Sequence, residues 1–266
     1  MLVRDKVVVV TGAGSGMGRE LTLELVRRGA KVAAVDLREE SLEQTQTLAQ
    51  GLGGTFKTFV MDITDADAVA ALPAKVEKEL GKADALINNA GIIQPFVKVN
   101  ELDMAAAMRV MKVNFDGPLM LIKAFLPVLI ARPEAHLLNV SSMGAYAPVP
   151  GQSVYGASKA AIKLLTEGLR SELKPTKVGV TLVFPGAIAT NIAQNSGMVI
   201  PEGAAENSNQ KTTAADVAAR AMVDAIEQNK PRITIGQDAK IMDLMSRWNP
   251  IKAADVIYKQ MANLLG

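Results

Sequence analysis

Short apolar runs alternate with longer amphipathic segments along most of the chain. Seven of the runs are short and rich in β-branched residues, and these are predicted strands: residues 6–10, 32–35, 56–61, 85–87, 135–140, 178–184 and 232–235. The segments between them carry apolar residues at helical spacing, and these are predicted helices: residues 20–28, 39–50, 65–80, 101–131, 154–173 and 214–228. Such alternation predicts an α/β fold, a doubly wound parallel sheet of about seven strands with helices on both faces.

The alternation of strands and helices breaks toward the C-terminus. Residues 187–212 are rich in Gly, Asn, Ser and Ala, which predicts a loop or short helices forming a substrate lid. Residues 238–266 predict a tail of one or two helices. Within 101–131 we expect one long helix or two abutting ones, with a bend near Pro118. We find neither repeats nor a linker, so residues 1–266 are predicted to form one domain.

The composition excludes several classes of function. With 49% hydrophobic residues the chain can bury a substantial core. Its net charge of +2 comes from 29 basic and 27 acidic residues that are scattered, which argues against a nucleic-acid partner. The absence of cysteine excludes disulfides and thiol catalysis, and a single histidine, His136, leaves few options for a metal site. No metal is therefore expected, and His136 is predicted to be structural or exposed.

The N-terminal residues do not resemble a signal peptide, because Arg4 and Asp5 come before any apolar region develops. No run reaches the ~18 apolar residues of a membrane span. We therefore expect a cytoplasmic protein.

A glycine-rich turn follows the first predicted strand and opens the first predicted helix. Its sequence TGAGSGMG matches T-G-x-x-x-G-x-G through Gly12, Gly16 and Gly18, while Met17 stands where the third glycine of G-x-G-x-x-G belongs. Glycines let the backbone approach a pyrophosphate, and the N–H groups that open the helix point at its charge. The context of strand and helix therefore predicts a dinucleotide-binding turn.

Asp36 ends the second predicted strand, twenty residues beyond Gly16. A carboxylate at this place accepts hydrogen bonds from both hydroxyls of an adenosine ribose and repels a 2′-phosphate. Ser15 offers no positive charge within the turn, although Arg38 is close enough in sequence to swing round. NAD is therefore favoured and NADP is the alternative. In the simplest alternative, Asp36 only begins a solvated loop.

Tyr155 and Lys159 are four residues apart in a predicted helix, so their side chains share one face. A free tyrosine titrates near ~10, and an adjacent ammonium is expected to lower the pKa of the phenol. The pair then suits acid/base catalysis. On its own Y-x-x-x-K is a common pattern, and it also suits a surface lysine beside a half-buried tyrosine.

Seven motifs in one order resemble the short-chain dehydrogenase/reductase family over about residues 5–235. The resemblance implies a Rossmann-like sheet and an NAD(P)-dependent oxidoreductase. The motifs are Thr11-Gly12-x-x-x-Gly16-x-Gly18, Asn88-Asn89-Ala90-Gly91, Asn114, Ser142, Tyr155-x-x-x-Lys159, Pro185-Gly186 and, after it, Thr190.

By this resemblance Tyr155 is the proton donor or acceptor, and Lys159 lowers its pKa and holds the nicotinamide ribose. Ser142 anchors the substrate oxygen, while Ser141 competes for this role with a less suitable spacing. Asn114 resembles the fourth catalytic member, which shapes a helix bend and holds a water that links the lysine to solvent.

The resemblance also implies a set of cofactor contacts. Asp62 with Ile63 flanks the adenine, and Ile188 with Thr190 holds the carboxamide. There are two alternatives to this assignment: Asn89 serves only strand-end hydrogen bonds, and Thr190 only caps the helix that follows. The full set is Gly12, Ser15, Gly16, Met17, Gly18, Asp36, Asp62, Ile63, Asn89, Ala90, Gly91, Tyr155, Lys159, Pro185, Gly186, Ile188 and Thr190.

Apolar, adaptable residues near the catalytic motifs favour a lipophilic alcohol or ketone as the substrate. They are Phe96, Met143, Tyr146, Pro148, Val149, Pro150, Met198 and Ile200. In the tail, a second apolar stripe is expected to serve the core or a subunit contact: Ile241, Met242, Leu244, Met245 and Trp248. The resemblance implies a homodimer or homotetramer that packs 101–131 and 154–173, with Ala161, Ile162, Leu164, Leu165 and Leu169 as suitable residues.

The sequence therefore predicts an NAD(H)-dependent oxidoreductase that interconverts a secondary alcohol and a ketone, or an alcohol and an aldehyde. A nucleotide-sensing regulator of the same fold is the alternative, but such sensors commonly lose the tyrosine or the lysine. A third reading, a dehydratase or epimerase on a nucleotide sugar, calls for a longer C-terminal substrate domain.

Overall fold

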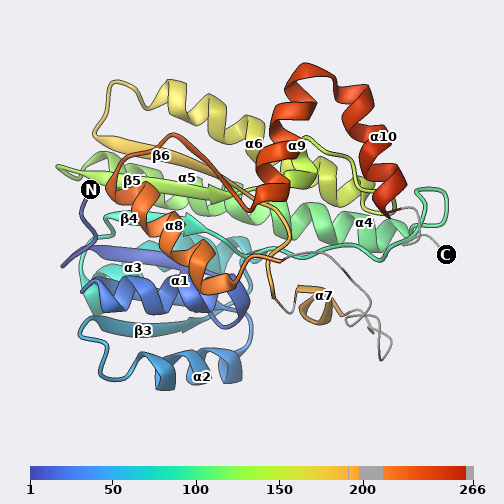
Figure 1. Cartoon of the computed structure of the whole chain (residues 1–266). Coiled ribbons are helices and arrows are strands. Elements are labelled where there is room, and N and C mark those ends of the chain that lie inside the picture. Colours follow the sequence, from blue (N-terminus) through green and yellow to red (C-terminus); the bar gives the residue numbers. More distant parts are fainter. Residues whose placement is uncertain (191, 198–211, 262–266) are drawn as a thin grey trace.

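The protein contains one seven-stranded parallel sheet with the order β3-β2-β1-β4-β5-β6-β7 and helices on both faces, which confirms the predicted fold (Figure 1). The computed structural model describes residues 1–190, 192–197 and 212–261. The strands are β1 (Val7–Thr11), β2 (Lys31–Asp36), β3 (Thr55–Val60), β4 (Ala85–Asn88), β5 (Ala135–Val140), β6 (Val178–Pro185) and β7 (Arg232–Ile235).

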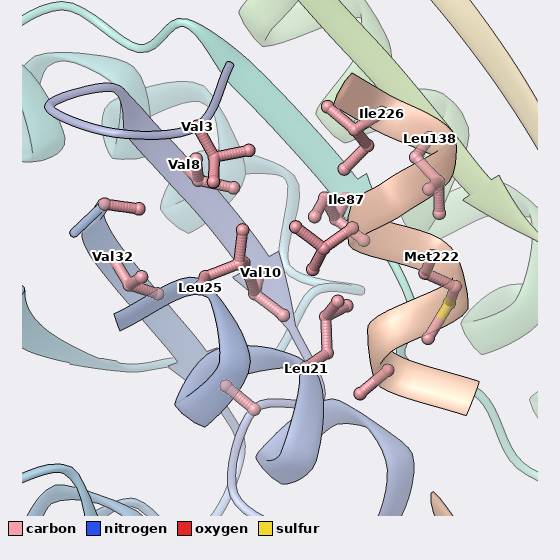
Figure 2. Packing of buried hydrophobic residues seen from close by; sticks show 14 of the residues in the cluster. Val3, Val8, Val10, Leu21, Leu25, Val32, Ile87, Leu138, Met222 and Ile226 are labelled. Carbon is pink, nitrogen blue, oxygen red and sulfur yellow. The ribbon is translucent and has the colours of Figure 1, made fainter. Parts of the chain in front are cut away.

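Two hydrophobic clusters cover the two faces of the sheet. In one, α1 and α8 pack on β1, β2 and β4 through residues such as Leu21, Met222 and Ile226 (Figure 2). In the other, α3, α5 and α6 pack on the opposite face through residues such as Phe125 and Leu169. The helices are α1 (Gly16–Arg27), α2 (Glu39–Ala49), α3 (Ala66–Leu80), α4 (Met104–Met111), α5 (Gly117–Ile130), α6 (Ser153–Glu172), α7 (Ile192–Asn195), α8 (Ala215–Glu227), α9 (Gln237–Trp248) and α10 (Pro250–Met261).

The strand order reverses at β1, which lies between β2 and β4. The chain moves outward from β1 to β3 and then returns to β4 on the other side. In open α/β sheets such a reversal leaves a crevice at the carboxyl ends of the strands, where ligands bind. Thr11, Asp36, Asn88, Val140 and Pro185 end strands at this edge of the sheet. The topology therefore gathers the predicted motifs.

The predicted helix over 101–131 is a continuous helical run from Met104 to Ile130 with a π-helical turn, η1 (Lys112–Asp116), in its middle. Pro118 has no N–H to donate to the carbonyl of Asn114, four residues earlier, which weakens the regular α-helical pattern at this place. Among the described residues this is the one helix long and apolar enough to cross a membrane, a test that core helices also pass. Its Leu121, Phe125 and Leu129 are buried in the core.

The tail forms two helices, as predicted. α9 and α10 pack together beside the loop that follows β5, where Met242, Ala253 and Ile257 surround Ala147. This loop contains a short 3₁₀ turn, η2 (Met143–Ala145). Of the predicted lid over 187–212, the described part includes α7, while Met198 and Ile200 lie outside the described residues.

The structure corrects part of the expected subunit surface. Ile162 and Leu169 are buried in the core of this chain and therefore cannot meet a second subunit. Leu164 is 69% exposed, as expected for a contact residue.

Candidate active site

A cavity of about 1090 Å³ opens at the carboxyl edge of the sheet. Every predicted cofactor residue lines it, from Gly12 in the first turn to Thr190 after β6. Ser142, Tyr155 and Lys159 also line it. Asn114 is 1% exposed and lies behind the cavity wall. The motifs that are scattered through the sequence therefore form one continuous site.

The glycine turn has the geometry of an anion cradle. Gly12 and Gly16 adopt positive φ angles of 68° and 50°, which side chains rarely allow. A Cβ at Gly18 would overlap the carbonyl group of Gly12, so α1 can only pack this closely on the turn with glycine there. α1 begins at Gly16, and the N–H groups of its first turn have no partners within the helix. These residues fit a pyrophosphate.

Asp36 lies in the cavity with its carboxylate fixed from two sides. Its Oδ2 accepts a hydrogen bond from the N–H of Gly14 at 2.9 Å, and its Oδ1 accepts one from the N–H of Arg38 at 3.1 Å. A carboxylate can accept about four hydrogen bonds, so it can still receive two ribose hydroxyls. This geometry fits the predicted contact to an adenosine ribose.

Asn195 is a cavity residue that the sequence did not reveal. It lies on α7, where its Oδ1 accepts a hydrogen bond from Arg38 Nη2 at 2.7 Å. Its Nδ2 donates to Ser15 Oγ in the glycine turn at 2.9 Å. Asn195 thus holds the guanidinium of Arg38 and joins the segment after β6 to the glycine turn.

Lys159 and Tyr155 lie side by side on α6, with the ammonium nitrogen 6.0 Å from the centre of the phenol ring. Lys159 Nζ donates to the carbonyl of Val140 at the end of β5, at 3.2 Å. Burial lowers the pKa of Lys159 to about 8. Its positive charge is therefore present at neutral pH and is lost at moderately alkaline pH.

Burial raises the pKa of the Tyr155 phenol above its ordinary value, and a hydrogen bond with Ser142 opposes this shift. Loss of solvent thus dominates the pKa of Tyr155 in this structure, and the predicted lowering by Lys159 stays a prediction. Tyr155 is held protonated at neutral pH.

The two candidate serines have different roles. Ser142 is an N-cap of the short turn η2, where its Oγ accepts from the N–H of Gly144 at 3.0 Å, and it also lines the cavity beside Tyr155. Ser141 is 2% exposed and donates to the carbonyl of Lys159 at 2.7 Å. The structure thus places Ser142 beside the phenol and commits Ser141 to holding α6.

Asn114 lies in the π-helical turn and uses its whole side chain to hold neighbouring segments. Its Oδ1 accepts from the N–H of Ile92, and its Nδ2 donates to the carbonyl of Ile92, both at 2.9 Å. Nδ2 also donates to Ser158 Oγ at 3.0 Å. Any Cβ at Gly91 would be 3.1 Å from Lys159 Nζ and 3.2 Å from Asn114 Oδ1. Asn114 therefore fastens the segment after β4 beside Lys159.

The Asn88-Asn89-Ala90-Gly91 motif joins two strand ends. Asn89 Nδ2 donates to the carbonyl of Thr11 at 3.0 Å, and Thr11 Oγ1 accepts from the backbone N–H groups of Asn89 and Ala90, both at 3.1 Å. Asn89 therefore makes the strand-end hydrogen bonds that were one alternative, and it also lines the cavity.

The turn after β6 is held by Asp238, which the sequence also did not reveal. Asp238 Oδ2 accepts from the N–H of Ala187 at 2.7 Å, and the same side chain lies against Gly186. Ile188 forms a bridge with Thr213 across the base of the predicted lid. α9 thus fixes the turn on which Ile188 and Thr190 enter the cavity.

Apolar side chains form part of the cavity lining. Phe96, Met143 and Val149 line it as predicted, whereas Tyr146, Pro148 and Pro150 do not. Tyr146 instead donates to the carbonyl of Ala239 at 2.8 Å and joins η2 to α9. The expected tail stripe divides in the structure. Met242 belongs to a core cluster as expected, with Met245 packed against it. Ile241, Met242 and Met245 also line the cavity, which the sequence did not predict, together with Val256 and Ile257.

His136 has a structural role. It is 1% exposed, and its Nε2 lies 2.8 Å from Thr181 Oγ1. The Thr181 hydroxyl donates its proton to the carbonyl of Lys230. Thr181 Oγ1 therefore accepts from His136, and the imidazole carries its proton on Nε2. Burial lowers the pKa of His136 to about 3. Among the described residues no cluster of three or more His, Cys, Asp and Glu side chains is placed to hold a metal.

Comparisons with known proteins agree with this geometry. The family described as short chain dehydrogenase matches residues 6–198. Among curated proteins, the chain is similar to the putative oxidoreductase SadH of Mycobacterium tuberculosis (strain ATCC 25618 / H37Rv). The two are 35% identical over 255 residues, which cover 91% of this chain and 90% of SadH.

Two solved structures share the fold and carry dinucleotides. One is a short chain dehydrogenase/reductase from Burkholderia phymatum in complex with NAD, with a TM-score of 0.82, 25% identity, and coverage of 94% of this chain and 98% of that one. The other is a short chain dehydrogenase from Burkholderia cenocepacia J2315 in complex with NADP, with a TM-score of 0.80, 30% identity, and coverage of 97% and 99%. Because the two bind different dinucleotides, the choice of cofactor depends on this chain's own residues.

Proposed function

Because the chain belongs to the short-chain dehydrogenase/reductase family of oxidoreductases, we propose that it interconverts a lipophilic secondary alcohol and its ketone with NAD(H). A primary alcohol and its aldehyde are the alternative substrate pair for the same reaction. The observation that carries the proposal is the position of Ser142 and Tyr155 in one cavity, between the glycine turn and a wall of apolar side chains. The cavity thus has a place for a dinucleotide, a proton donor and an apolar substrate.

In the proposed mechanism, Tyr155 moves the proton to and from the substrate oxygen. Its raised pKa keeps the phenol protonated, which suits donation to a ketone oxygen during reduction. Ser142 donates a hydrogen bond to the same oxygen and fixes its distance from the phenol. A bound nicotinamide ring supplies hydride transfer at the adjacent carbon.

Lys159 supplies positive charge beside Tyr155 and would hold a ribose hydroxyl of a bound cofactor. The charge favours the phenolate that forms once the proton has left. Asn114 keeps the segment after β4 packed against Lys159 and so maintains its position.

Asp36 supports a preference for NAD(H). Its carboxylate would receive the ribose hydroxyls and would repel a 2′-phosphate. Arg38, the nearby cation that favours NADP, has its guanidinium bonded to Asn195.

A panel of aliphatic and cyclic secondary alcohols and their ketones, followed through NADH absorbance, tests the proposed reaction. Turnover by the unmutated protein and its loss in Tyr155→Phe are expected. Tight NADH binding without turnover of any member of the panel would contradict the proposal and would favour the nucleotide-sensing alternative.

We further propose a homodimer or homotetramer formed through α4, α5 and α6. Met104 and Met108 on α4 and Leu164 on α6 are 69%, 61% and 69% exposed, and large exposed apolar side chains are the kind that a subunit contact covers. Light scattering of the unmutated protein and of Met108→Lys tests it. A monomer at micromolar concentration would contradict it.

A further inference from the structure

A stripe of exposed apolar side chains runs along α9. Ile241, Leu244 and Trp248 are 55%, 72% and 81% exposed. Because an α-helix turns by about 100° per residue, these three positions lie within about 60° of one another around the axis of α9. We call them the α9 stripe. They lie on the hairpin of α9 and α10, which forms an outer edge of the molecule far from α2 (Figure 1).

The α9 stripe begins at the mouth of the cavity. Ile241 is exposed and also lines the cavity, so it lies where the cavity meets the surface. Met245, one turn further along α9, lines the cavity as well, as do Val256 and Ile257 on α10. The exposed stripe is therefore continuous with an apolar part of the cavity lining.

The charges beside the α9 stripe are mainly positive. The exposed charged residues on the described part of α9 and α10 are Lys240, Arg247, Lys252, Lys259 and Asp255. Lys240 and Arg247 share one flank of α9, next to Leu244, because they are seven residues apart. The ammonium nitrogen of Lys252 lies 5.7 Å from the centre of the Trp248 ring. Cations thus surround the stripe from both helices.

The other acidic residues of the two helices bind groups of the protein itself. Asp238 accepts from the N–H of Ala187 at 2.7 Å. Asp243 accepts from both terminal nitrogens of Arg232 on β7, at 2.6 and 2.7 Å, and from Arg247 at 3.1 Å. The charge of Asp243 is therefore compensated from the core side, and the surface beside the stripe keeps an excess of positive charge.

The chemistry of the partner follows from these features. A helix with tryptophan and leucine on one face and lysine or arginine beside them is typical of helices that lie in a membrane interface. Anionic lipid headgroups attract such cations. A second copy of this chain would instead bring the same positive charges to a symmetric contact, where they repel.

We propose that the α9 stripe docks the protein on the surface of a membrane that contains anionic lipids. The mouth of the cavity at Ile241 then faces the lipid, where lipophilic molecules concentrate. This docking goes beyond the proposed function and does not depend on it, because it involves neither turnover nor a bound dinucleotide.

Trp248 provides the test, because it is the one tryptophan in the sequence and its fluorescence therefore reports on the stripe. The protein is mixed with vesicles of phosphatidylcholine alone, or of phosphatidylcholine with about 30% phosphatidylglycerol. With the anionic vesicles we expect a blue shift of the emission and sedimentation of the protein with the vesicles. Binding to phosphatidylcholine alone should be weaker by about fivefold or more, and added salt should reduce the difference.

Leu244→Glu should weaken binding to the anionic vesicles by about tenfold or more, because it places a carboxylate within the stripe. Leu48→Glu is the matched control, since it makes the same change at a leucine on α2 that is 53% exposed, and it should bind within about twofold of the unmutated protein. Lys240→Glu combined with Lys252→Glu keeps the stripe and reverses two charges, so it should lose the preference for anionic vesicles. This double variant takes the place of Leu244→Glu if the latter does not fold.

Three results would overturn the proposal. One is the absence of a blue shift and of sedimentation with anionic vesicles, or equal binding to the two kinds of vesicle. Another is equal binding by Leu244→Glu and Leu48→Glu. The third is a smaller assembly of Leu244→Glu than of Leu48→Glu in light scattering without vesicles, which would assign the stripe to a second copy. Since no measurement uses a substrate, each of these results leaves the oxidoreductase proposal intact.

Discussion

Gln94 caps the helix that carries Tyr155. Its Oε1 accepts hydrogen bonds from the backbone N–H groups of Val154 and Tyr155, both at 2.9 Å. These N–H groups belong to the first turn of α6, where no partner within the helix is available. Gln152, at the N-cap position, makes no cap hydrogen bond with its own side chain, so Gln94 takes over this role from a distant segment.

We predict that Gln94→Ala destabilises the protein by about 1–3 kcal/mol, since it removes a cap and leaves buried N–H groups without partners. It should also reduce kcat, because the start of α6 then no longer holds Tyr155. Urea unfolding and steady-state kinetics measure the two effects. Gln94→Glu keeps the acceptor and should retain more of the stability at neutral pH; equal losses in both variants would contradict the capping role.

Tyr155→Phe should lower kcat by roughly 10²–10⁴-fold, because it removes the proton-transferring hydroxyl and keeps the ring. NADH affinity and the unfolding temperature should change little. Lys159→Ala should reduce both kcat and NADH affinity, since it removes a charge and a ribose contact. Fluorescence titration with NADH, combined with kinetics, separates the two patterns. Near-normal turnover by the Phe variant would remove Tyr155 from the mechanism.

The pH dependence of ketone reduction should reflect the protonation of Lys159. Burial lowers the pKa of Lys159 to about 8, so its charge is present below this pH and is lost as the pH rises through it. The kcat/KM for reduction should therefore be constant between pH 6 and 7 and fall above about 8. A pH–rate profile measures it, with Lys159→Arg as the control, because arginine stays charged and should move the fall to higher pH. A constant profile to pH 10 would contradict the assignment.

Asp36→Ala should narrow the difference between NADH and NADPH affinity, because it removes both the ribose acceptor and the repulsion of a 2′-phosphate. We expect the unmutated protein to bind NADH more tightly. Asp36→Asn is neutral and keeps one acceptor oxygen. Its difference between NADH and NADPH affinity should lie between those of the unmutated protein and Asp36→Ala. Titration of each protein with both dinucleotides measures these affinities. Tighter NADPH binding by the unmutated protein would contradict the role of Asp36 and would show that Arg38 sets the cofactor preference.

His136 should make the protein sensitive to acid. Its pKa is about 3 in the folded state and near ~6.5 in the unfolded state, so the unfolded state binds more protons between these values. The contribution of His136 to the free energy of unfolding is fully present above pH 6.5 and is lost as the pH falls toward 3. Between pH 7 and 4.5 the free energy of unfolding should fall by about 2–3 kcal/mol from this residue. Urea unfolding at both pH values measures the loss, and His136→Gln should show a smaller one.

The sequence by itself determined the fold and the general place of the site. The hydrophobic periods of strands and helices are local properties of the sequence, so the order of the elements could be predicted. Most of the predicted boundaries lie within one or two residues of the observed ones. The glycine turn was predictable because steric crowding against Gly12 excludes any side chain at Gly18. The carboxyl edge followed from topology, since successive parallel strands end on the same side of a sheet.

Only the tertiary structure decided which polar groups meet. The choice between Ser141 and Ser142 depended on which hydroxyl lies beside Tyr155, and the raised pKa of Tyr155 depended on burial by distant segments. The hydrogen bond between Gln152 and Gln94 could not be predicted from the sequence, because a single polar residue in each of two separate segments forms no periodic pattern. Burial and hydrogen-bond partners arise from contacts between residues far apart in the chain, and these contacts exist only once the fold has formed.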